Sequence, residues 1–149
     1  MVAMLARVHT ILRAVESSRS FTTVAAHVKK GDMLEVTRRI SQGDVDRFTR
    51  VIGDKNPIHS SDQPPEHRLI PGSLLNGIVS GLVGSQLPGP GSILVSQKLS
   101  FPHKCVVDKD INIRIEVADL RKIITVTYEC YQEKKLVFKG EANLIHKEV

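Results

Sequence analysis

An aspartate and a histidine stand close together in the run Gly53-Asp54-Lys55-Asn56-Pro57-Ile58-His59. A carboxylate and an imidazole that meet in space can hold one water molecule and exchange its proton, because an imidazole changes charge near neutral pH. Pro57 fixes one backbone angle between Asp54 and His59 and so stiffens the segment. The same residue types also form ordinary turns, so spacing alone leaves a catalytic and a purely structural interpretation open.

Two further residues could contribute to such a site. Gly72 precedes an apolar segment, and a free backbone N–H at a helix start can stabilise a developing negative charge on oxygen. A glycine there can equally serve close packing alone. Ser80 follows eight residues later, but a serine inside a helix usually bonds back to its own backbone. Neither residue predicts chemistry by itself.

The elements that would position Asp54 and His59 begin with a strand over 33–40 and a helix over 42–52. Ser41 can cap this helix, with Asp44 as its partner in a capping box. Gly53 ends the helix in the usual way. The following segment, 53–71, carries four prolines and is predicted to be a loop.

A second helix is predicted after this loop, with Pro71 at its first position. Apolar residues recur at helical spacing over 74–83, interrupted by several glycines, so this helix must be stabilised by burial. After a Pro-Gly turn at 87–91 the apolar period becomes two. The predicted strands span 93–101, 111–118, 124–130 and 136–145, with hairpin connections at 119–122 and 132–135. The pattern predicts an α+β domain in which the buried helix covers one face of an antiparallel sheet.

The composition fits one globular domain. The chain has 149 residues, of which 41% are hydrophobic and 25% charged, and no apolar run is long enough to span a membrane. Cys105 and Cys130 lack the spacing of a metal site. We predict that both are reduced, packed thiols.

The net charge of +5 is concentrated at the N-terminus. Residues 1–30 hold five Lys or Arg and one Glu, a net charge of +4, whereas the remainder holds 16 basic and 15 acidic residues, a net charge of +1. A nearly neutral body with few aromatic residues does not predict a partner among nucleic acids. An RNA-associated role would rest on bulk charge alone.

The N-terminal segment is typical of a mitochondrial transit peptide. It is rich in Arg and Ser, poor in acids, and has apolar residues at helical spacing over 5–15. The alternative is an ordinary amphipathic helix that packs on the domain. We predict a leader over 1–30, matrix localisation, and a single domain over 31–149.

Four motifs, taken in order, resemble the MaoC-type family of R-specific enoyl-thioester hydratases. They are the 53–59 run, the helix start at Gly72, the Leu-Pro-Gly-Pro-Gly turn at 87–91 and the Ser-Gln-Lys-Leu-Ser-Phe segment at 96–101. The resemblance runs from about residue 33 to the C-terminus and is strongest over 46–101. Within the family, the chain looks most like the mitochondrial hydroxyacyl-thioester dehydratases of type 2.

The resemblance implies a hotdog fold, in which an antiparallel β-sheet wraps around a central α-helix. It implies reversible dehydration of a (3R)-hydroxyacyl thioester to the trans-2-enoyl thioester, carried on acyl carrier protein or coenzyme A, in mitochondrial type II fatty acid synthesis. It also implies a homodimer and no metal or other cofactor. By motif it makes Asp54 and His59 the catalytic pair, Gly72 the oxyanion donor, Ser80 an active-site residue, and Asn56 a residue that shapes the loop.

Two departures from the family pattern keep other functions open. Pro71 stands where the family usually has a histidine before the glycine, and the segment between His59 and Gly72 is shorter than usual. One alternative is therefore a thioester-binding hotdog protein with weakened catalysis. Another is a hotdog thioesterase, in which Asp54 would activate water for hydrolysis.

Overall fold

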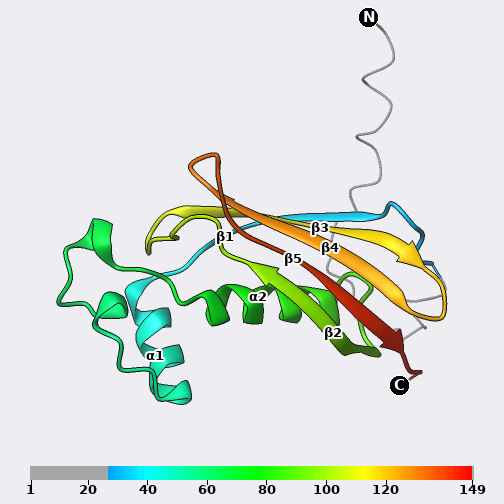
Figure 1. Cartoon of the computed structure of the whole chain (residues 1–149), viewed down its shortest axis with the longest axis horizontal. Helices are drawn as coiled ribbons and strands as arrows, with labels where there is room; N and C mark the ends of the chain where they lie inside the picture. Colours follow the sequence, from blue (N-terminus) through cyan, green and yellow to red (C-terminus); the bar gives the residue numbers. More distant parts are fainter. Residues whose placement is uncertain (1–26, 149) are drawn as a thin grey trace, which may run out of the picture.

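The computed structural model describes residues 27–148 (Figure 1). Every predicted helix and strand is present, with ends shifted by at most a few residues. Their bounds are β1 (Met33–Arg39), α1 (Gln42–Ile52), α2 (Gly72–Ser85), β2 (Ser92–Ser100), β3 (Asp110–Leu120), β4 (Ile124–Gln132) and β5 (Lys135–His146). The predicted loop also contains two single 3₁₀ turns, Pro57–His59 and Pro65–His67. The transit-peptide prediction falls on residues 1–26, outside the described part of the chain.

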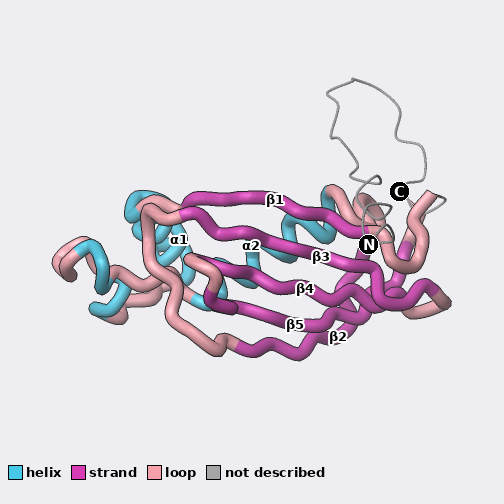
Figure 2. The backbone as a smooth tube through the Cα atoms, turned by 90° about the horizontal axis from the view of Figure 1, so that it is seen from above, coloured by secondary structure: helices cyan, strands magenta, loops and turns pink. Residues whose placement is uncertain are grey.

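The five strands form one antiparallel sheet in the order β1-β3-β4-β5-β2 (Figure 2). Strands β3 and β4 pair as one hairpin and β4 and β5 as the next, as the sequence predicted. Along β4, buried residues alternate with partly exposed ones, which is the period-two pattern of a sheet with one covered face. The covered face is the one that lies against α2 (Figure 1).

Helix α2 is held in place by its buried side. Its buried side chains are Leu75, Val79, Leu82 and Val83. Each fully buried aliphatic side chain contributes roughly 1.5–3 kcal/mol, which offsets the cost of about 1 kcal/mol for each helical glycine. The helix begins at Gly72, one residue later than predicted, because Pro71 occupies the cap position and its carbonyl accepts from the N–H groups of Leu74 and Leu75.

Helix α1 has the predicted capping box at its start. Asp44 N–H donates to Ser41 Oγ over 3.2 Å, and Ser41 N–H donates to an Asp44 carboxylate oxygen over 2.9 Å. The Ser41 N–H and the Ser41 hydroxyl both donate to the Asp44 carboxylate, and these two hydrogen bonds lower the pKa of Asp44. At the other end Gly53 adopts a left-handed conformation with φ of 74°, which glycine adopts without strain. The end of α1 is therefore defined at the residue before Asp54.

Cys105 and Cys130 are both free and buried, as predicted. Burial raises the pKa of each thiol to about 12. Among residues 27–148, no helix is both long enough and apolar enough to cross a membrane.

Candidate active site

The loop that follows α1 brings Asp54 and His59 together. The nearer oxygen of Asp54, Oδ2, lies 3.6 Å from His59 Nε2. The two side chains are 29% and 12% exposed, so the pair is sheltered but can still be reached from solvent. A separation of 3.6 Å is too long for a direct hydrogen bond. It leaves room for both groups to contact one small oxygen-bearing molecule.

Asn56 shapes this loop by hydrogen bonds on both sides. Its backbone N–H donates to Asp54 Oδ1 over 2.9 Å, and its side-chain Oδ1 accepts from the backbone N–H of Ile58 over 3.3 Å. Asn56 thereby caps the 3₁₀ turn that begins at Pro57. The turn carries His59 back toward Asp54, and one Asp54 oxygen is used within the loop while the other faces the imidazole.

The backbone carbonyl of Leu69 fixes the orientation of the histidine ring. His59 Nδ1 lies 2.6 Å from Leu69 O. A carbonyl oxygen only accepts hydrogen bonds, so Nδ1 carries a hydrogen. In the neutral imidazole, Nε2 is then an acceptor that faces the Asp54 carboxylate, and a proton or a proton donor between them is stabilised by both groups.

The segment that supplies Leu69 is itself anchored. Leu69 N–H donates to Ile58 O over 3.0 Å, and Leu69 also forms an isolated antiparallel β-bridge with Val106. The side chain of Gln42, at the start of α1, donates to His59 O over 2.7 Å. The contacts to Ile58 O and His59 O hold the backbone beside the histidine, and the hydrogen bond from Nδ1 to Leu69 O restrains the ring itself.

Gly72 is the first residue of α2, and its N–H has no acceptor inside the helix. A side chain at this position would meet the ring of Phe101, because an added Cβ would lie 2.7 Å from the nearest ring carbon. Packing therefore favours glycine here whether or not its N–H also binds a substrate oxygen. Phe101 in turn stacks on Phe138, with ring centroids 4.9 Å apart.

Ser80 lies two turns further along α2 and borders a pocket of about 90 Å³. This pocket is lined mainly by apolar side chains of α2, β2 and β5, and Asp54 and His59 do not line it. Tyr128 lies at its wall, and its hydroxyl points to Gln97 Oε1 at 3.5 Å. Burial raises the pKa of Tyr128 to about 12, so the phenol stays neutral at physiological pH.

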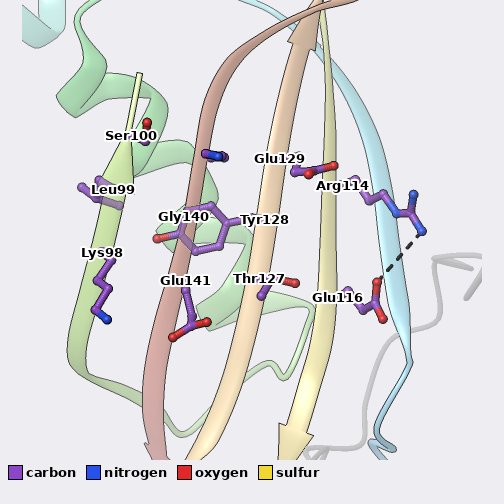
Figure 3. A pocket seen from close by; sticks show the side chains of 11 residues that line it. Lys98, Leu99, Ser100, Arg114, Glu116, Thr127, Tyr128, Glu129, Gly140 and Glu141 are labelled. Atoms are coloured by element: carbon purple, nitrogen blue, oxygen red, sulfur yellow. Dashed lines mark ion pairs between the residues drawn. The ribbon is translucent and has the colours of Figure 1, made fainter. Parts of the chain in front are cut away.

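A second hollow, of about 480 Å³, lies over the middle strands of the sheet (Figure 3). Its charged side chains are three basic and three acidic: Lys98, Arg114, Lys139, Glu116, Glu129 and Glu141. The charges balance, and Arg114 contacts Glu116 at 4.0 Å. This charged surface has no excess charge to bind an ion, and none of the hydroxyl groups that line it hydrogen-bonds to one of its carboxylates. It is therefore a weaker candidate than the Asp54–His59 loop.

Sequence reasoning did not identify several residues around the candidate site. Leu69 acts through a backbone carbonyl, which leaves no signature in the residue type. Gln42 and Phe101 reach the site from other elements. Within the described residues, no group of three or more His, Cys, Asp or Glu side chains is arranged to hold a metal ion.

Comparisons with known proteins place the chain among thioester hydratases and dehydratases. It is 33% identical over 113 residues to the 3-hydroxybutyryl-CoA dehydratase of Methylorubrum extorquens, covering 70% of this chain and 72% of that protein. It is 28% identical over 141 residues to a mitochondrial 3-hydroxyacyl-[acyl-carrier-protein] dehydratase of Arabidopsis thaliana, covering 85% of this chain and 84% of that protein.

Among solved structures, the (R)-hydratase of Aeromonas caviae involved in PHA biosynthesis superposes with a TM-score of 0.75 at 30% identity, covering 81% of this chain and 98% of that chain. The fold is thus the hotdog fold that the sequence predicted. No protein-family model matches the chain.

Proposed function

The chain belongs to the MaoC-like family of R-specific enoyl-thioester hydratases and hydroxyacyl-thioester dehydratases, and from this membership we propose that Asp54 and His59 are its catalytic pair. The family makes the chain a hydro-lyase that acts on hydroxyacyl and enoyl thioesters. The observation that carries the assignment is the placement of Asp54 Oδ2 and His59 Nε2, 3.6 Å apart on a hydrogen-bonded loop.

The reaction requires two proton exchanges and one stabilised oxygen. Dehydration removes the α-proton of the (3R)-hydroxyacyl thioester and delivers a proton to the departing β-hydroxyl. One member of the pair takes the first proton and the other gives the second, and hydration reverses both transfers. Negative charge develops on the thioester oxygen, where the Gly72 N–H and the helix dipole would stabilise it.

Hydration of crotonyl-CoA tests this assignment. Asp54→Asn and His59→Ala should each lower kcat by at least about 100-fold, the usual contribution of a positioned acid or base. Asp62→Asn and His67→Ala are matched controls, because both residues are exposed on the same loop. The controls should retain wild-type turnover. Full activity in either Asp54→Asn or His59→Ala would remove the pair from the mechanism.

Two further measurements separate the alternatives. Release of free coenzyme A from an acyl-CoA, detected with a thiol reagent, would identify a thioesterase instead. Binding of acyl-CoA without hydration or hydrolysis, by a folded wild-type protein, would favour a binding protein.

We further propose that the enzyme works in the mitochondrial matrix on intermediates of type II fatty acid synthesis, carried on acyl carrier protein or coenzyme A. The composition of residues 1–30 and the mitochondrial plant relative support this placement. Residues 1–30 fused to a fluorescent reporter should direct it to mitochondria, and a cytosolic signal would contradict the proposal. Turnover of the same acyl group on the two carriers would identify the preferred one.

The homodimer is also a proposal, and the two sheet edges differ in a way that supports it. The edge strand β2 exposes the apolar residues Ile93, Leu94, Val95 and Leu99, whereas β1 exposes mainly charged and polar side chains. Unprotected apolar edges tend to pair, so the β2 edge is where two copies would join. Val95→Lys should yield a monomer in sedimentation, and Thr37→Lys on β1 should not. An unchanged dimer with Val95→Lys would place the interface elsewhere.

A further inference from the structure

Gln132 is the last residue of β4, and its polar side chain is buried. The carboxamide makes two hydrogen bonds to a single residue, Val106. Its Nε2 donates to Val106 O over 2.9 Å, and its Oε1 accepts from Val106 N–H over 2.9 Å. Exchanging the two ends of the carboxamide would set donor against donor and acceptor against acceptor, so its partners fix this orientation. The side chain therefore pairs with Val106 as the peptide group of a neighbouring strand would.

Val106 belongs to a short antiparallel ladder that runs toward the candidate active site. Backbone hydrogen bonds of 2.8 and 3.1 Å join segments 105–107 and 68–70. Leu69 and Val106 lie opposite each other between these two hydrogen bonds. Residues at such a position direct their N–H and C=O groups away from the pairing partner. Both backbone groups of Val106 thus meet Gln132, while those of Leu69 face the opposite side.

On that opposite side, Leu69 holds the 3₁₀ turn that carries the imidazole. Leu69 N–H donates to Ile58 O over 3.0 Å, and Leu69 O accepts from His59 Nδ1 over 2.6 Å. Hydrogen bonds therefore connect the Gln132 carboxamide, the 105–107/68–70 ladder and the His59 ring in one continuous series. A buried network in which every group is paired is rigid, so the position of Leu69 O depends on that of Gln132.

The main sheet anchors Gln132 at the start of this series. Gln132 pairs with Lys135 across the turn between β4 and β5. The two turn residues, Glu133 and Lys134, have φ values of 50° and 65°, as in a tight two-residue hairpin. The turn lies at the same end of the molecule as α1 (Figure 2). Without the carboxamide, a buried N–H and C=O of Val106 would lose their partners, which is unfavourable, and segment 105–107 would move to satisfy them.

We propose that Gln132 is a positioning residue that orients the His59 ring through the 105–107/68–70 ladder. This inference rests on the proposed function and deepens it by a residue that touches no substrate. The hydrogen bond from Nδ1 to Leu69 O keeps Nε2 turned toward Asp54, and a misplacement of about 1 Å can cost roughly 100-fold in rate. The effect should fall on kcat and leave KM unchanged, because no contact with the thioester is altered.

Two substitutions of Gln132 test the proposal in the hydration of crotonyl-CoA. Gln132→Met keeps the length of the side chain but neither hydrogen bond, and should lower kcat by roughly 10- to 100-fold. Gln132→Glu keeps both hydrogen bonds only while the introduced carboxyl is protonated, because a carboxylate cannot donate to Val106 O. Burial raises the pKa of that carboxyl above its usual range. The kcat of Gln132→Glu should therefore match that of the wild type at acidic pH and fall below it as the pH rises through this pKa.

Two control variants separate positioning from general stability. Val117→Ala opens a cavity in the core at a residue whose backbone pairs with Gly31 and Asp32. It should lower Tm and leave kcat and its pH profile unchanged. Gln86→Glu alters an exposed residue directly after α2 and should follow the wild-type pH profile throughout. Circular dichroism at each pH checks that the Gln132 variants remain folded.

The tautomer of His59 provides a measurement that needs no turnover. Nitrogen NMR signals of this ring, assigned by their loss in His59→Ala, should show the hydrogen on Nδ1 in the wild type at mildly alkaline pH. In Gln132→Met the carbonyl of Leu69 is displaced, so the ring should shift toward the tautomer with the hydrogen on Nε2. In Val117→Ala the tautomer should stay as in the wild type.

Two results would overturn the proposal. Gln132→Met with a lower Tm, wild-type kcat and an unchanged His59 tautomer would make Gln132 a purely structural residue. A pH profile of folded Gln132→Glu parallel to that of the wild type would show that the hydrogen bond to Val106 O is not needed, and this test decides the matter even if Gln132→Met does not fold. Absence of hydration by the wild type would count against the proposed function, whereas an unchanged tautomer in Gln132→Met would count against the positioning role, so the two failures are distinguishable.

Discussion

Replacing Gly72 with alanine should reveal how tightly the start of α2 is packed against Phe101. The added Cβ would lie 2.7, 2.9 and 3.1 Å from three carbons of the ring, too close to be accommodated without movement. Overpacking of this kind costs about 1–3 kcal/mol. Phe101 is 47% exposed, so its ring can move outward and the cost should fall toward the middle of that range.

The same substitution has a favourable component. Alanine is better than glycine in a helix interior by about 1 kcal/mol, and at the first helical residue the gain is a fraction of this. The net destabilisation should therefore be about 1–2 kcal/mol. In a Phe101→Leu background most of the clash is removed, and Gly72→Ala should become neutral or stabilising. The expected coupling between the two positions is therefore about 1–2 kcal/mol.

Urea denaturation of the four proteins of this double-mutant cycle measures the coupling. Crotonyl-CoA hydration by the same proteins adds the functional side, since alanine keeps the backbone N–H. Turnover lost in Gly72→Ala should be partly recovered when Phe101 is also replaced, if displacement of the helix start is the cause. An identical stability change in both backgrounds would refute the packing argument.

Three further predictions concern stability and reactivity. Hydrogen bonds from Ser41 depress the pKa of Asp44 below 3.8 in the folded state, so the ionised carboxylate stabilises the folded protein above pH 3.8, and this stabilisation is lost as the pH falls through the folded pKa. Asp44→Ala should therefore lower the free energy of unfolding by about 0.5–1 kcal/mol at neutral pH and not at all in strong acid, which denaturation at several pH values would show. Burial raises the pKa of Cys105 and Cys130 to about 12, so Ellman's reagent should label neither thiol in the folded protein at mildly alkaline pH and both after unfolding; rapid labelling of the native protein would contradict this. Gly140→Ala would place a Cβ against a tyrosine ring and 2.7 Å from a backbone carbonyl of β2, and should destabilise by about 3 kcal/mol or more; an unchanged urea midpoint would be inconsistent with this packing (Figure 3).

Most of the fold could be predicted from sequence because its signals are local. The alternation along 124–130 and the capping box at Ser41 and Asp44 each depend on a few neighbouring residues, and both are present in the structure. The predicted start of α2 was one residue too early, because a proline suits both the cap position and the first helical position. The strand order could not be read from periodicity, since it depends on how distant segments pair.

In the candidate site, too, contacts within a short segment could be predicted, whereas contacts between distant segments could not. The approach of Asp54 to His59 follows from a stiff turn of a few residues, which sequence can indicate. The acceptor of the His59 ring is a backbone carbonyl ten residues away, and any residue type at position 69 could provide it. The ring of Phe101 reaches Gly72 because the chain returns along the edge strand β2 to the start of α2, a contact that no local sequence pattern indicates.

The two departures from the family pattern leave the contacts of the candidate site in place. The shortened segment still returns Leu69 to His59, with a hydrogen bond of 2.6 Å to the ring. Pro71 still starts α2, because its carbonyl accepts from the N–H groups of Leu74 and Leu75 and leaves the Gly72 N–H outside the helical ladder. Neither departure therefore removes an atom that the proposed proton transfers need. What the shorter segment reduces is the length of chain that can cover a bound acyl group, so its effect should fall on the choice of substrate and leave the proton chemistry intact.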